Sequence, residues 1–186
     1  MALTATIDAT GERVWRSIVD PSERPFWDDR ILGEIKRPLP DRPKRPKSQR
    51  KTRSSRAPGN TPDKSPSDVE PIRCTRWRFR FSGIPLVLVD ETHRTEGHER
   101  LFGRISIGSM RFEQTITIVE EQDESGPRIR LGMKLVANNS IAVIGELVPR
   151  LEVQRFVIEY VDTTLRLIRK HCEADARSAL AQAARS

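Results

Sequence analysis

The longest regular pattern in the chain lies near its C-terminal end. Its members follow one another at alternating spacings of four and three residues: Leu147, Leu151, Gln154, Ile158, Val161, Leu165, Ile168 and Cys172. That spacing places them along one face of an α-helix, and charged residues occupy the other faces. The pattern therefore predicts a long amphipathic helix that packs on another element through one side.

Before this helix, the chain alternates apolar and polar residues in several short segments. The alternation predicts strands at 3–8, 30–37, 75–81, 86–95, 100–107, 110–121 and 128–136. Between the first two strands, 12–19 carries the apolar face of a helix that Asp8 or Thr10 can cap, and 22–27 predicts a second short helix or turn. Clean alternation is typical of antiparallel strands with one solvated face. The predicted fold class is α+β, a curved seven-stranded antiparallel sheet covered by one long helix.

One segment interrupts this pattern. Residues 38–71 hold eight of the thirteen prolines and almost no apolar side chains. Such a composition cannot bury enough surface to offset the entropy of ordering, so we expect a disordered insertion. The prediction is a single domain formed by 1–37 and 72–178, with a frayed tail at 179–186.

The net charge of +7 comes from the same region. Residues 36–64 carry eleven Lys or Arg against two Asp, so that this window contributes +9 and the remainder −2. Three interpretations stay open: a solvated linker, contact with an anionic membrane surface, or nucleic-acid binding, although the segment lacks aromatic residues that would stack on bases. Because it leaves the sheet at the end opposite the turn at 82–85, we do not expect it to cover a ligand site.

The remaining bulk features exclude several classes of protein. No run approaches eighteen apolar residues, which predicts no membrane span, and no secretory signal is visible, so the cytoplasm is the expected location. Cys74 and Cys172 lack metal-ligand spacing, and two buried thiols are expected rather than a disulfide. His93 and His98 match no standard ligand set, and no phosphate-binding loop or nucleophile motif occurs, so neither a metal nor a cofactor is predicted.

The opening of the chain carries a resemblance to a known superfamily. Thr6-Ile7-Asp8-Ala9 leads into Glu12-Arg13-Val14-Trp15, followed by Asp20-Pro21 and Trp27, and 100–113 is similar to two central strands. In these features the chain resembles the START-like superfamily of polyketide cyclases/dehydrases and lipid-transport proteins (SRPBCC). The resemblance implies a helix-grip fold, a bent sheet wrapped round the C-terminal helix with a hydrophobic cavity between them. Members bind lipids, sterols, polyketides or similar molecules, and some are enzymes.

The cavity face follows from the phase of each strand and of the long helix. Its expected ligand-binding residues are Trp77, Phe79, Phe81, Leu101, Ile105, Phe112, Gln114, Ile116, Leu131, Met133, Gln154, Ile158 and Val161. Gln114 and Gln154 interrupt apolar stripes, and a buried amide must find a hydrogen-bond partner in protein, water or ligand. The turn Ser82, Gly83, Ile84 and Pro85 resembles the entrance loop of the plant hormone receptor branch.

The strand at 86–95 has an ambiguous phase. If Val87 and Val89 face inward, Glu91 and His93 share the cavity wall and are candidates for an acid/base pair. The other phase brings Leu86, Leu88, Asp90 and Thr92 inward. The first hypothesis is therefore a binding or carrier protein for one hydrophobic small molecule. The alternatives are a cyclase/dehydrase-like enzyme using the same cavity, and an interaction module acting through the basic segment.

Overall fold

The computed structural model describes residues 1–36, 70–108, 110–123, 126–137 and 150–185. Its elements follow in the order β1 (Ala2–Ile7), α1 (Gly11–Val19), α2 (Arg24–Trp27), β2 (Ile31–Glu34), β3 (Arg73–Phe81), β4 (Ile84–Glu96), β5 (Arg100–Ile107), β6 (Met110–Asp123), β7 (Gly126–Ala137) and α3 (Arg150–Ala183). The predicted order of strands and helices is confirmed. The proposed insertion, apart from its last two residues, and Leu147 at the expected start of the long helix lie outside the described residues.

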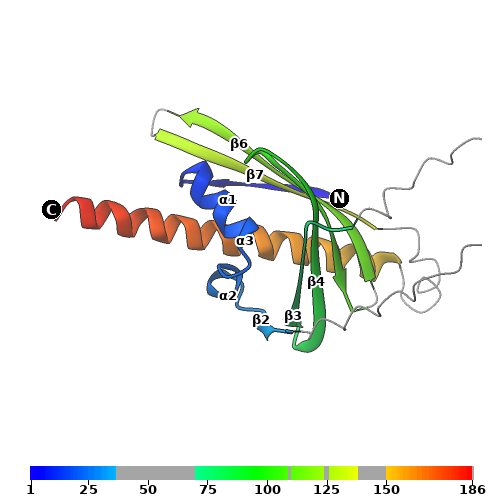
Figure 1. Cartoon of the computed structure of the whole chain (residues 1–186). Coiled ribbons are helices and arrows are strands. Elements are labelled where there is room, and N and C mark those ends of the chain that lie inside the picture. Colours follow the sequence, from blue (N-terminus) through cyan, green and yellow to red (C-terminus); the bar gives the residue numbers. More distant parts are fainter. Residues whose placement is uncertain (37–69, 109, 124–125, 138–149, 186) are drawn as a thin grey trace, which may run out of the picture.

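The strands form one sheet in the order β1-β7-β6-β5-β4-β3-β2, and every neighbouring pair is antiparallel. The sheet curves over α3, which runs along its concave side, while α1 and α2 lie beside the same helix (Figure 1). This is the helix-grip arrangement, so the predicted fold class is confirmed. The concave side of the sheet and one face of α3 therefore enclose the core.

The link between β1 and β2 follows from local signals in the sequence. Thr10 caps α1, and its hydroxyl accepts a hydrogen bond from the backbone N–H of Arg13 at 3.3 Å. The helix ends at Val19, and its C-cap residue Asp20 has extended backbone because Pro21 restricts the residue before it. The indole of Trp27 then donates to the carbonyl oxygen of Ser17 at 2.9 Å. That bond fixes α2 against α1 and so places the α2 side chains under the sheet.

The core consists of the inward half of each alternating strand. On β3, Trp77, Phe79 and Phe81 are buried, while the intervening Arg78 and Arg80 are exposed. The remaining strands and α3 supply the other fully buried large side chains, which include Ile7, Leu88, Ile105, Ile107, Phe112, Ile129, Leu131, Tyr160, Val161 and Ile168. Burial of this apolar surface is the main force that holds the sheet to α3.

The pairing of β4 with β5 contains an irregularity. The pairing of these strands shifts between Thr92 and Arg94, and Gly103 lies opposite Thr92. A Cβ atom at Gly103 would collide with the backbone oxygen of Glu91. The close approach of the two backbones therefore requires glycine at this position.

Gly103→Ala is expected to destabilise the fold by about 1–3 kcal/mol, because two paired backbones must separate to admit the methyl group. The matched control is Gly11→Ala, where the new atom collides with the carboxylate of Glu120, a flexible side chain that can move, and otherwise makes an ordinary contact with Ile129. The control is expected to change stability by no more than about 0.5 kcal/mol. Urea denaturation followed by tryptophan fluorescence measures both. Equal effects from the two substitutions would contradict the proposed backbone contact.

The helix α3 continues to Ala183, well past the last residue of the predicted stripe at Cys172. The helix therefore includes part of the tail at 179–186, whose fraying stays a prediction. This end of the helix extends beyond the sheet (Figure 1), and Leu180 on it is 71% exposed. No helix among the described residues is long and apolar enough to cross a membrane.

The two cysteines are free and differ in environment. Cys172 is fully buried, whereas Cys74 is exposed, so the expectation of two buried thiols is wrong for Cys74. Burial raises the pKa of the Cys172 thiol, and the hydroxyl of Ser17 lies 3.4 Å from its sulfur. A thiol that is both buried and protonated is chemically inert.

At pH 8, the native protein is expected to react rapidly with iodoacetamide at one thiol, Cys74, while Cys172 reacts only after denaturation. Mass spectrometry of the labelled protein counts the modified thiols directly. Cys74→Ser should leave no rapidly reacting thiol in the native state. Labelling of both cysteines at one rate in the folded protein would contradict the burial of Cys172.

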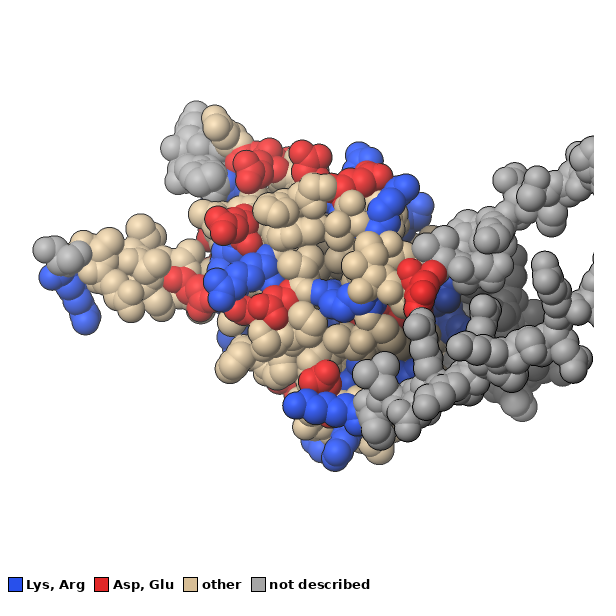
Figure 2. Space-filling view, viewed as in Figure 1, with Lys and Arg blue, Asp and Glu red and all other residues tan. Residues whose placement is uncertain are grey.

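Charged groups of both signs are interspersed on the described surface of the face in Figure 2. No continuous basic patch is visible there. The described surface on this face therefore offers no support for a membrane or nucleic-acid partner. The basic window at 36–64 lies outside the described residues except for Lys36.

Candidate functional site

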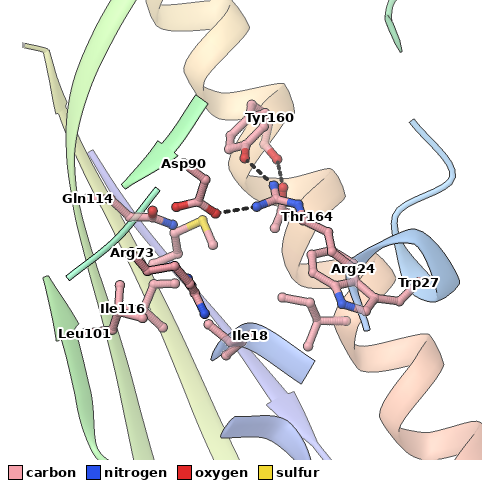
Figure 3. A pocket seen from close by; sticks show the side chains of 12 residues that line it. Ile18, Arg24, Trp27, Arg73, Asp90, Leu101, Gln114, Ile116, Tyr160 and Thr164 are labelled. Carbon is pink, nitrogen blue, oxygen red and sulfur yellow. Dashed lines mark hydrogen bonds and ion pairs between the residues drawn. The ribbon is translucent and has the colours of Figure 1, made fainter. Parts of the chain in front are cut away.

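A cavity lies between the concave side of the sheet and the three helices. Its lining comprises Ile18, Arg24, Trp27, Arg73, Asp90, Leu101, Gln114, Ile116, Met133, Tyr160, Thr164 and Ile168 (Figure 3). The enclosed space is about 20 Å³, which holds about one water molecule. The lining combines an apolar wall with an unusual concentration of charged and hydrogen-bonding groups.

Strand register brings the sheet side of this cavity together. Asp90 lies opposite Ile105, Gly103 lies opposite Gln114, and Ile116 lies opposite Met133. Inward-facing positions on adjacent strands are neighbours, so side chains from β3 to β7 form one continuous band under the helices.

Arg24 is the central charged group of the cavity. It is 8% exposed and reaches from α2 between the sheet and α3 (Figure 3). Its Nη1 donates to Asp90 Oδ2 at 2.5 Å and its Nη2 donates to the Tyr160 hydroxyl at 3.1 Å. Burial alone would lower the pKa of Arg24, but Tyr160, Asp90 and Asp28 raise it above its ordinary value. The guanidinium is therefore held charged and joins α2, β4 and α3.

A second arginine, Arg30 in the turn before β2, supports this arrangement. Arg30 forms a two-point contact with the fully buried carboxylate of Asp28, with Nε–Oδ1 at 2.8 Å and Nη2–Oδ2 at 3.1 Å. Its Nη2 also donates to Thr164 Oγ1 at 2.8 Å on α3. The guanidinium lies over the rings of Phe79 and Tyr160, 5.2 and 5.0 Å from their centroids. These contacts fix the orientation of Tyr160.

Several donors around the cavity lack a protein acceptor. The Nε atoms of Arg24 and Arg73 are buried without a hydrogen-bond partner among the described residues. Gln114 is 5% exposed and lines the cavity. Burial raises the pKa of the Tyr160 hydroxyl, with Arg24 partly opposing this, so the phenol keeps its proton at neutral pH. Each buried donor without an acceptor lowers the stability of the fold by roughly 1–3 kcal/mol, unless a water or a ligand accepts its hydrogen bond.

The predicted cavity residues on the strands are all buried on the concave side. Four of them line the cavity itself, namely Leu101, Gln114, Ile116 and Met133. The others contribute to the surrounding core: Trp77, Phe79, Phe81, Ile105, Phe112 and Leu131. Val161 on α3 is likewise fully buried in this core.

On α3, the prediction is wrong at two described positions of the stripe, Gln154 and Ile158. The side chain of Gln154 is exposed and that of Ile158 is 44% exposed. The helix instead packs Val157, Tyr160 and Thr164 against the sheet. Gln154 therefore contributes nothing to the cavity, and Gln114 is the amide that does.

The phase of β4 is the second of the two alternatives. Leu88 and Thr92 are buried and Asp90 lines the cavity, so Glu91 and His93 lie on the outer face. There, His93 Nε2 is 3.7 Å from Glu91 Oε2, which is also 3.6 Å from Arg104 Nη1 on β5. The two candidates for an acid/base pair are close together but do not face the cavity.

The turn at 82–85 joins β3 to β4 at the far end of the hairpin from the cavity. Ser82 and Gly83 have positive φ values of 47° and 83°, and the Ser82 hydroxyl donates to Glu159 Oε1 at 3.2 Å. The turn thus contacts α3, but the cavity lies near Arg73, at the opposite end of β3. No residue of the expected entrance loop is among the described residues that line the cavity.

The polar lining was missed because its residues look like surface groups in the sequence. Arg24 and Asp90 are charged, and Tyr160 and Thr164 fall between the apolar positions of the predicted helix stripe. Arg73 begins a strand whose other arginines alternate outward. The one available signal was the second phase of β4, which brought Asp90 inward and required a buried cation as its partner.

Comparisons with known proteins were made for both sequence and structure. No protein-family model and no curated protein matches the sequence. A START superfamily protein from Mycobacterium smegmatis is 13% identical, with a TM-score of 0.57 over 94% of this chain and 97% of that protein. The aromatase/cyclase Zhui from Streptomyces sp. R1128 is 13% identical, with a TM-score of 0.57 over 96% of each chain. A protein from Thermus thermophilus is 17% identical, with a TM-score of 0.56 over 94% of this chain and 97% of that protein.

These likenesses extend over nearly the whole chain and concern its fold. The chain has the START-like, helix-grip fold that its sequence resembles. At identities of 13–17%, the choice of ligand and any chemistry must be argued from the residues of the cavity.

Proposed function

We propose that this protein binds one small, largely hydrophobic molecule in the cavity between the sheet and α3, as a binding or carrier protein. The observation that carries the proposal is Gln114, a buried amide side chain that lines the cavity between the apolar positions Phe112 and Ile116 of its strand. A residue that served packing alone would be apolar at this position. Apolar walls with a few convergent polar groups are typical of small-molecule sites.

The small volume of the cavity limits how a ligand can bind. A space of about 20 Å³ accepts one water, so a larger molecule must displace lining side chains. Met133 and Leu101 are suitable for this because methionine in particular adapts its shape at little cost. We therefore expect binding to be accompanied by rearrangement of side chains around Met133.

The likeness to a START superfamily protein and to an aromatase/cyclase supports this class of function. An enzyme of the cyclase type would use the same cavity, but Glu91 and His93 face away from it. Within the cavity, the carboxylate of Asp90 is already paired with Arg24. Binding is therefore the function that the arrangement favours.

A titration with the uncharged fluorescent probe N-phenyl-1-naphthylamine tests the proposal. The wild-type protein is expected to bind one probe with enhanced fluorescence, and Leu101→Phe, which fills the cavity from β5, should weaken binding at least about tenfold. Val119→Phe introduces the same side chain on the outer face of β6, where Val119 is 51% exposed, and should bind as the wild type does.

Circular dichroism spectra of both variants should match that of the wild type if both are folded. Absence of probe binding to the wild type, or equal binding by Leu101→Phe and Val119→Phe, would overturn the proposed site.

A further inference from the structure

We propose that the bound molecule carries a carboxylate at its inner end, held by Arg73, Gln114 and Arg24. The inference rests on the proposed function, because it concerns the ligand of the same cavity. It goes beyond that function by naming the chemical group that the cavity recognises.

The first argument is the kind of polar group left unpartnered. The Nε–H of Arg73 is buried and no described residue accepts its hydrogen bond, while the buried Nε–H of Arg24 makes no hydrogen bond and only an ion-pair contact of 3.6 Å with Asp28 Oδ2. The Tyr160 hydroxyl accepts a bond from Arg24 Nη2, which leaves its own proton available to donate. The Gln114 amide adds two N–H donors. A site so rich in donors is complementary to a group that only accepts, and an ionised carboxylate is such a group.

The second argument is charge. The buried cluster contains three guanidinium groups and two carboxylates, so its net charge is 3 − 2 = +1: Arg24, Arg30, Arg73, Asp28 and Asp90. Arg24 and Arg30 are paired with Asp28 and Asp90. The excess positive charge is therefore on Arg73.

Among the described residues, Arg73 has no carboxylate partner of its own, because Asp90, which attracts its charge, is already paired with Arg24. The Nη2 of Arg73 donates to the neutral hydroxyl of Thr92 at 3.1 Å, and no described carboxylate lies within ion-pair distance of it. Asp20 lies nearby but is in solvent, which screens its charge. A half-buried cation without a counter-charge of its own is destabilising, and a ligand with a single negative charge would neutralise it.

A single water is the alternative occupant, since the cavity has room for one. Water would satisfy the donors but not the charge. The two alternatives make different predictions for a pair of ligands that differ only in their ionisable group. Such a pair is 2-naphthoic acid and 2-naphthalenemethanol.

The test measures displacement of N-phenyl-1-naphthylamine from the full chain by these two compounds at pH 7.5. For the wild type, the acid is expected to bind at least about tenfold more tightly than the alcohol, as a charge-assisted hydrogen bond implies. Arg73→Gln should reduce that ratio to about one. The control Arg111→Gln, on the exposed outer face of β6, should leave the ratio unchanged.

The outcomes separate the two proposals. Three results would overturn the carboxylate inference while probe binding stands. The acid and the alcohol displace the probe equally, neither compound displaces it, or a folded Arg73→Gln variant still prefers the acid to the alcohol. If the wild type does not bind the probe at all, the proposed function falls and the inference falls with it. Should Arg73→Gln fail to fold, Gln114→Leu replaces it, and an unchanged ratio there overturns the inference.

Discussion

Replacement of Arg24 by methionine is expected to destabilise the protein by about 3–5 kcal/mol, the largest effect of any single change at the cavity. The substitution keeps most of the side-chain volume but removes the cation between Asp90, Asp28 and Tyr160. Asp90 and Asp28 would then be buried with less compensating charge. Urea denaturation, followed by the fluorescence of the three buried tryptophans, measures the loss.

The control is Arg16→Met on α1. Arg16 also forms an ion pair, with Glu23 at 3.3 Å, but its side chain is 66% exposed. Its loss should cost no more than about 1 kcal/mol, because solvent-exposed pairs contribute little. The double substitution Arg24→Met with Asp90→Leu should recover part of the stability, since it removes both charges. A small effect of Arg24→Met, similar to that of Arg16→Met, would contradict the central position of Arg24 in the core.

Phe79→Ala is expected to cost about 3–5 kcal/mol, because it empties a large volume that neighbouring groups cannot fill. Phe79 is fully buried on β3, with ring centroids 6.2 Å from Phe81 and 6.1 Å from Tyr160. Its ring also lies against the guanidinium of Arg30. The substitution therefore removes both core packing and one support of the polar cluster. Thermal and urea unfolding measure the effect.

The same change at Phe26 provides a matched control. Phe26 is 79% exposed on α2, and Phe26→Ala should alter stability by no more than about 0.5 kcal/mol. Comparable losses at the two positions would mean that the packing around Phe79 is not as described.

The order of elements could be predicted because strand alternation and helix capping are local signals. The aromatic run Trp77, Phe79 and Phe81 fixes the inward side of β3 without reference to any other strand. The same logic fails for β4, where Leu86 to Val89 are all apolar and either phase is possible. There the phase depends on a tertiary contact, because Asp90 faces inward only where Arg24 from α2 neutralises it.

The predicted stripe of α3 was accurate from Val161 to Cys172 and failed at Gln154 and Ile158. Alternating spacings of four and three average 3.5 residues per turn, whereas an α-helix has 3.6, so such a stripe drifts by about 20° per heptad. Counted back from Cys172 along α3, this drift turns Gln154 and Ile158 away from the sheet. The residues that replace them, Tyr160 and Thr164, are polar, and their burial depends on Arg24 and Arg30.

Only the apolar part of the cavity could be predicted, because its polar part depends on contacts between distant segments of the chain. Its apolar wall follows from strand phase, which brought Leu101, Ile116 and Met133 to one side. Its polar end is made by long-range pairing between α2, β3, β4 and α3. No spacing within the sequence encodes those partners, although a buried acid on β4 would have required one.

The central claim is that the space between the sheet and α3 holds a small molecule. Native mass spectrometry of the full chain, purified from its own host, tests this most directly when compared with the denatured mass of the same sample. The wild type and Val119→Phe are expected to carry one bound small molecule that denaturation releases, and Leu101→Phe should carry none. Identical native and denatured masses for the wild type, together with no binding of N-phenyl-1-naphthylamine, would contradict the claim.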